Sequence, residues 1–98
     1  MAHITGGGIP GNLNRVLPSS CDAAVDTATW EIPNLFQVLA EGGGVEREEM
    51  FRAFNMGVGM VVISTGDVAE RIQQHAKSQG VHAWTMGAIT NGSGRVNL

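Results

Sequence analysis

The residues best suited to chemistry stand near the start of the chain, in the stretch HITGGG at residues 3–8. Three successive glycine amides can form a concave set of N–H donors for an anion, and phosphate is the guest we expect. A helix that begins near Pro10 would add positive partial charge at the same place. His3 and Thr5 offer a proton-transfer group and a hydroxyl donor. A tight turn or a slack N-terminal tail would use the same glycines, so the spacing alone leaves these alternatives open.

Polar residues on the predicted short helix extend this candidate site. The glycine run is followed by Asn12, Asn14 and Arg15, whose polar side chains could reach a bound anion. The run lacks the Lys-Ser/Thr ending of a P-loop, and the pattern GxxxxGK[ST] occurs nowhere in the chain. Any phosphate bound here would therefore be held without the lysine of a P-loop.

A second glycine-containing stretch, FNMGVGM at residues 54–60, marks the place where a helix is predicted to hand over to a strand. Gly57 and Gly59 would fall on one face of that strand and leave room there for a ligand or another backbone. Asn55 is a polar residue between apolar neighbours, and Arg52 lies three positions before it. As a dinucleotide fingerprint the stretch is weak, because its third glycine is missing and it opens a strand. Spacing alone favours close strand packing over ligand binding.

The composition limits the function classes. The 98 residues are 43% apolar and 15% charged, which favours one small folded domain over disorder. The net charge is −3 and the six basic residues are scattered, so we expect no nucleic-acid partner. The single cysteine excludes an internal disulfide, and the three histidines show no metal-ligand spacing with it. The longest apolar run is too short for a bilayer and the N-terminus lacks a signal-peptide pattern, so we expect no membrane contact and a cytoplasmic location.

Hydrophobic periodicity and turn residues predict an α/β or α+β domain with a layered mixed sheet and packed helices. Asp67 is expected to cap the last helix, and a turn at residues 91–94 is expected to join the last two strands into a hairpin. The predicted helices lie at residues 10–16, 33–42, 46–53 and 67–79, and the predicted strands at 2–5, 23–26, 57–64, 83–90 and 95–98.

Four sequence blocks together resemble the phosphoribosylformylglycinamidine cyclo-ligase family, also called aminoimidazole ribonucleotide synthetase. The blocks are AHITGGG, N-x-x-RVLP, W-x-x-P-x-x-F and E-M-x-R-x-FN-x-G-V-G-M, in the order and spacing of that family. The resemblance runs from Ala2 to Leu98 and is more specific than either glycine motif alone. It implies that residues 1–98 form a single partial domain, the later part of the family's C-terminal domain, whose α/β fold is partly ferredoxin-like.

The resemblance implies an ATP-dependent ligase of purine biosynthesis. In this family ATP and Mg serve to activate the formyl oxygen of formylglycinamidine ribonucleotide, and a substrate nitrogen then displaces phosphate to close the imidazole ring. The expected partners are the ribonucleotide substrate, the family's ATP-binding N-terminal domain, which the chain is expected to lack, and a second copy in a homodimer. Met1 before Ala2 is expected to be an added or relocated start.

The resemblance also implies roles for individual residues, with no metal ligand among them. His3 is the candidate catalytic residue. The sequence departs from the family where Asn14 replaces a frequent proline and where Ala53 replaces a common threonine, which removes a hydroxyl near the second glycine stretch. The candidate substrate- and phosphate-binding residues are Thr5, Gly6, Gly7, Gly8, Asn12, Asn55 and Gly57.

Two other functions stay open beside the ligase. One is a non-catalytic phosphate- or nucleotide-binding module. The other is a fragment that self-associates through apolar surface left without its partner strands. A site built between two domains cannot preorganise reacting groups when one side is absent, so the isolated chain is expected to show no ring closure.

Overall fold

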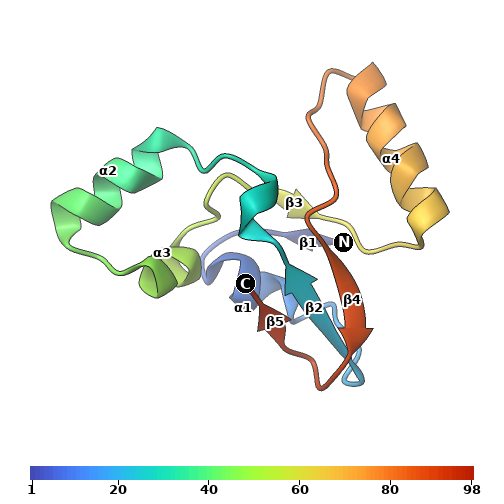
Figure 1. Ribbon diagram of the computed structural model, residues 1–98, viewed down its shortest axis with the longest axis horizontal. Coiled ribbons are helices and arrows are strands. Elements are labelled where there is room, and N and C mark those ends of the chain that lie inside the picture. Colours follow the sequence, from blue (N-terminus) through green and yellow to red (C-terminus); the bar gives the residue numbers. More distant parts are fainter.

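The structure is a computed structural model that describes residues 1–98. Four α-helices, five short strands and one 3₁₀ turn form a mixed α/β arrangement (Figure 1), which confirms the predicted fold class. In chain order the elements are β1 Ala2–His3, α1 Gly8–Leu13, β2 Cys21–Val25, the 3₁₀ turn Thr27–Thr29, α2 Asn34–Gly43, α3 Arg47–Ala53, β3 Met60–Val61, α4 Gly66–Ser78, β4 Gly87–Asn91 and β5 Val96–Asn97.

The strands form two small sheets. β1 pairs antiparallel with β3, and His3 lies opposite Met60. In the other sheet β2 lies between β4 and β5. β2 runs antiparallel to β4, with Ala23 opposite Ile89, and parallel to β5. The last two strands of the chain, β4 and β5, therefore flank β2 on its two sides.

The predicted hairpin between residues 83–90 and 95–98 is wrong, because β4 and β5 both pair with β2 and not with each other. The carboxylate of Asp22 in β2 accepts hydrogen bonds from the N–H groups of Ser93 and Arg95, each at 2.8 Å. These bonds bend the connection around the end of β2. The last strand, β5, therefore pairs with the side of β2 opposite β4.

Four predicted strands are shorter than expected, because residues 2–5 and 95–98 also contribute only Ala2–His3 and Val96–Asn97. Of residues 57–64 only Met60–Val61 are strand, because residues 55–58 close a turn instead. Of residues 83–90 only the part from Gly87 onward pairs with β2. A run of apolar residues thus predicted the strands but not their ends.

The predicted helices are confirmed with shifted ends. α1 occupies Gly8–Leu13 and not residues 10–16, because left-handed Gly7 precedes it and starts the helix early. α4 begins at Gly66 with Thr65 as its N-cap residue, so Asp67 lies in the first turn and is not the cap. The ends of α2 and α3 differ from their predicted positions by at most one residue, which is within the usual scatter of helix ends.

The core lies where α1 packs against α3. Its largest fully buried side chains are Ile9, Leu13, Met50 and Phe51. Gly8 lets the two helices approach closely, because a Cβ atom at this position would overlap the carbonyl group of Phe51. Gly8, the last glycine of the run, therefore lies at one of the closest backbone contacts of the molecule.

The part of the molecule around α4 is open. Neither α4 nor α2 contains a buried residue, and all five residues of β4 are exposed. Figure 1 shows α4 standing apart from α1–α3, joined to the sheets by extended segments. None of the helices has the length and apolar character needed to cross a membrane.

Candidate functional site

The glycine run forms a tight loop between β1 and α1. Gly7 and Gly8 both have positive φ, at 99° and 65°. The N–H of Gly8 donates to the carbonyl of Thr5 at 3.0 Å, whereas the N–H groups of Gly6 and Gly7 donate to no acceptor within the chain. Two of the three predicted donors are therefore free, and the third closes the loop.

The side chain of Asn12 holds this loop from inside. Asn12 is 5% exposed, and its Nδ2 donates to the carbonyl of Gly8 at 2.8 Å, with longer bonds to the carbonyls of Thr5 and Gly6. The hydroxyl of Thr5 donates to its Oδ1 at 3.2 Å. Because a buried amide satisfied in this way fixes its partners, the geometry gives Asn12 a positioning role. Its role as a direct ligand stays a prediction.

The three glycines differ in what they require. Gly8 is needed for close approach to α3, and Gly7 for its left-handed conformation. Gly6 has neither reason, because its φ is ordinary and a Cβ there would meet no atom within 4 Å. Packing within this chain therefore does not explain the missing side chain of Gly6.

The second glycine stretch is a strained turn. The carbonyl of Asn55 accepts the N–H of Val58 at 3.0 Å, and the two residues between them have positive φ, 54° at Met56 and 98° at Gly57. Positive φ at both central residues is typical of a type I′ turn. The Oδ1 of Asn55 also accepts the N–H of Gly57 at 2.9 Å, so that amide is not available to a ligand.

The W-x-x-P block clamps this turn. Trp30 Nε1 donates to the carbonyl of Met56 at 3.1 Å. The ring of Pro33 packs on Gly57, where a Cβ would come within 2.6 Å of Pro33 Cδ. A non-glycine residue with positive φ persists only where its surroundings enforce it. Trp30 and Pro33 are thus positioning residues. The sequence did not predict this role, although both residues belong to the W-x-x-P-x-x-F block that carries the family resemblance.

The two loops emerge side by side. The N–H of Ile4 donates to the carbonyl of Gly59 at 2.9 Å, next to the β1–β3 ladder. A Cβ at Gly8 would also lie 2.9 Å from the carbonyl oxygen of Phe54. The fold therefore brings together the two stretches that the sequence singled out, which lie about fifty positions apart.

His3 is not part of this pair of loops. Its neighbours Ala2 and Ile4 are buried, whereas His3 is exposed on the opposite side of the strand. There it lines a large groove whose lining includes Gly57 and Gly59 but none of the three residues of the glycine run. Its catalytic role stays a prediction.

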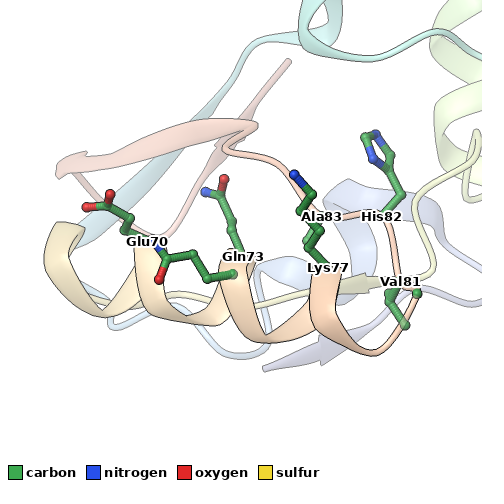
Figure 2. Close-up of a pocket in the computed structure, with 8 residues that line it drawn as sticks. Glu70, Gln73, Lys77, Val81, His82 and Ala83 are labelled. Carbon is green, nitrogen blue, oxygen red and sulfur yellow. The ribbon is translucent and has the colours of Figure 1, made fainter.

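The groove just mentioned and a smaller depression are concave surfaces that the sequence did not reveal. The groove has a volume of about 1190 Å³, and 18 of its 28 lining residues are hydrophobic. The depression, of about 660 Å³, lies between α4 and the segment that follows it (Figure 2). Polar side chains from Glu70, Gln73 and Lys77 on the helix and His82 on the segment surround it.

The two carboxyl groups whose pKa values are lowered, those of Asp22 and Asp67, lie outside the glycine run and the turn at residues 55–58. Hydrogen bonds from the N–H groups of Arg95 and Ser93 lower the pKa of Asp22 below its ordinary value of 3.8. The Thr65 hydroxyl and the N–H groups of the first turn of α4 lower the pKa of Asp67. No three His, Cys, Asp or Glu side chains gather where they could hold a metal ion.

Comparison with known proteins matches residues 1–97 to the family described as AIR synthase related protein, C-terminal domain. The chain belongs to this family. The resemblance predicted from the four sequence blocks is therefore confirmed over nearly the whole chain.

Similar curated proteins carry the name phosphoribosylformylglycinamidine cyclo-ligase. The one from Neisseria gonorrhoeae is 46% identical over 94 residues, which cover 96% of this chain and 27% of the relative. Those from Neisseria meningitidis serogroup C strain FAM18 and from Picosynechococcus are 47% and 48% identical, over 96% and 98% of this chain. The chain thus spans about a quarter of the length of these relatives, which their names identify as ligases.

Proposed function

We propose that this chain is the C-terminal part of an ATP-dependent cyclo-ligase of purine biosynthesis. The enzyme would close the imidazole ring of aminoimidazole ribonucleotide from formylglycinamidine ribonucleotide. The observation that carries the proposal is the identity of 46% to 48% with curated cyclo-ligases along almost the entire chain. Because the chain spans only 27% of the gonococcal relative, it would act together with a counterpart of the remaining part of that enzyme.

In this proposal the glycine run holds a phosphate of the ribonucleotide. The free N–H groups of Gly6 and Gly7 would donate to phosphate oxygens, and Thr5 would lie beside them. The absence of a side chain at Gly6 lets the anion approach the backbone. α1 has only six residues, so the loop amides carry the binding and the helix end adds little. Asn12 keeps the loop carbonyls turned inward, away from the anion.

The turn at residues 55–58 would contact the substrate next to the phosphate. The Oδ1 of Asn55 is engaged by Gly57, but its Nδ2 donates to no acceptor within the chain. That amide is therefore a candidate donor to the substrate. Gly57 would shape the turn and not bind directly, since its N–H is already used.

The proposal assigns the remaining roles as follows. His3 is the candidate acid or base, on the groove side of the β1–β3 ladder. ATP would supply the phosphoryl group that activates the formyl oxygen. The residues present do not form a cation site, so Mg would be held by other parts of the enzyme. We further propose a cytoplasmic homodimer in which an N-terminal domain supplies most ATP contacts.

A chimera tests this function. The matching region of the gonococcal relative is replaced by this chain, and ATP-dependent ring closure is measured on the purified protein. We expect the chimera to be active and the 98-residue chain alone to show no turnover. A chimera with native-like circular dichroism and no ring closure, or turnover by the chain alone, would contradict the proposal.

A phosphate-binding module without catalysis is the second candidate, and the free N–H groups of Gly6 and Gly7 favour it. Trp30 bonds to the neighbouring turn, so its fluorescence should respond to a ligand there. Titration of the isolated chain with ribose 5-phosphate separates the candidates. A saturable change together with an inactive chimera would favour the module over the ligase.

A further inference from the structure

Trp84 joins the segment that follows α4 to the 3₁₀ turn that precedes Trp30. Its Nε1 donates to the hydroxyl of Thr29, the last residue of that turn, at 3.2 Å. The centroids of the Trp84 and Trp30 rings lie 6.0 Å apart, with 43° between the ring planes. This spacing is within the range of favourable aromatic pairs. Trp84 therefore contacts Trp30 directly and also holds the turn from which Trp30 projects.

A second long-range bond fixes the other end of the same 3₁₀ turn. The N–H of Asp26, its N-cap residue, donates to the carbonyl of Met86 at 2.8 Å. The Thr29 hydroxyl donates to the carbonyl of Asp26 at 2.7 Å, which ties the two ends of the turn together. Because both ends bind the segment that contains Trp84 and Met86, the place of Trp30 depends on that segment.

Trp30 in turn restrains the turn at residues 55–58. Its Nε1 holds the carbonyl of Met56, whose φ of 54° is positive, and a non-glycine residue keeps such a conformation only where its surroundings enforce it. Trp30 is itself only partly buried against the core. Core packing alone therefore does not fix its ring, and the contact with Trp84 supplies a further restraint.

We propose that Trp84 is a positioning residue for the proposed substrate site, acting through Trp30 on the turn at residues 55–58. That turn presents Asn55, whose Nδ2 is the proposed donor to the substrate. The link from Trp84 to the turn concerns this chain alone, whereas its effect on the substrate rests on the proposed function. A series of contacts establishes coupling only when a change at one end is measured at the other.

Amide hydrogen exchange of the 98-residue chain tests the link to the turn. The N–H of Val58 closes the turn on the Asn55 carbonyl, and the N–H of Met50, bonded in the first turn of α3, reports a general loss of stability. Trp84→Ala should lower the protection of Val58 about tenfold relative to that of Met50, since a ring pair and a hydrogen bond are lost together. Met86→Ala is the matched control. It shortens another partly buried side chain of the same segment, keeps the backbone bond to the 3₁₀ turn, and should leave the ratio unchanged.

Two milder variants separate the hydrogen bond from the ring contact. Trp84→Phe keeps a ring against Trp30 but lacks the Nε1 donor, and Thr29→Val removes the acceptor at an exposed position. Both delete the same bond, so each should lower the protection ratio about threefold, and the double variant should be no worse than either one. An unchanged ratio in Trp84→Ala, or in Thr29→Val where Trp84→Ala does not fold, overturns the proposal. An equal fall in Met86→Ala also overturns it.

The chimera tests the effect on the substrate. Trp84→Ala should raise KM for formylglycinamidine ribonucleotide about fivefold with little change in kcat, because a contact made equally in the ground state and the transition state is weakened. Combined with Asn55→Ala it should raise KM no further, since Trp84 acts through the turn that presents Asn55. An active chimera whose KM does not respond to Trp84→Ala contradicts the positioning role. An inactive unsubstituted chimera contradicts the proposed function instead, and the exchange ratios still decide the link to the turn.

Discussion

The helices α1 and α3 and the helix α4 lie in different surroundings. α1 and α3 bury Ile9 and Phe51 against each other, and their contact supports the glycine loop. α4 presents Ile72 toward the apolar groove yet contains no buried residue. Hydrophobic periodicity therefore predicts a helix but does not predict which element packs against its apolar side. The packed half forms the candidate site, whereas the open half leaves the apolar groove and β4 exposed.

The largest expected effect is a loss of core packing. Phe51→Ala should lower the free energy of unfolding by about 3–5 kcal/mol, because it empties a fully buried position. Ile72→Ala in the open half should cost well under half of that, since Ile72 is only partly buried. Urea unfolding followed by circular dichroism measures both. Equal losses in the free energy of unfolding would show that the two halves do not differ in packing.

The next effect concerns the close approach of α1 to α3. Gly8→Ala should destabilise the fold by about 2–3 kcal/mol, because the added methyl overlaps the Phe51 carbonyl. Gly66→Ala at the start of α4 is the control. It meets no atom within 4 Å and should stabilise the chain by about 0.5 kcal/mol. A neutral Gly8→Ala variant would show that the packing is looser than described.

Removing the Asn12 side chain should have an intermediate effect. Asn12→Ala deletes the amide bonds to the loop carbonyls and should cost about 1–2 kcal/mol of stability. In the active chimera it should also raise KM for the ribonucleotide, because the loop is no longer held. Asn14→Ala is the matched control, as Asn14 is exposed and makes no side-chain hydrogen bond. An unchanged KM at Asn12→Ala would contradict the positioning role.

The smallest effect is a dependence on pH at the turn that leads to β5. The pKa of Asp22 is lowered by the N–H groups of Arg95 and Ser93, so its carboxylate stabilises the fold above its unfolded pKa. That stabilisation is lost as the pH falls through the lower folded value. The protection of the Ser93 and Arg95 amides, measured as the ratio of the intrinsic to the observed exchange rate at each pH, should therefore fall below about pH 3.8. In Asp22→Asn this protection ratio should no longer change in this range, and an unchanged dependence would refute the assignment.

Local patterns predicted the helices but not the topology. The helices near residues 33–42, 46–53 and 67–79 follow from apolar spacing and from helix-ending glycines, which are local signals. The side of β2 on which β5 lies depends on Asp22 reaching Ser93, some seventy positions away. No spacing within residues 91–98 contains that information.

The candidate site shows the same limit. The glycine run and the 55–58 turn were recognisable from their residues, and their proximity follows from the β1–β3 ladder. The left-handed Met56 was not predictable, because Trp30, 26 positions earlier, holds its carbonyl. Nor could spacing show that Asn12 turns its amide back into the loop.

The most direct test of the central claim compares two glycines in the chimera. Gly6→Ala and Gly11→Ala both add a methyl group where no atom lies within 4 Å. If phosphate lies against the loop amides, Gly6→Ala should raise KM for formylglycinamidine ribonucleotide about tenfold, the loss of one charge-assisted hydrogen bond. Gly11→Ala should leave KM unchanged. Equal KM values for the two variants and the unsubstituted chimera would contradict the account.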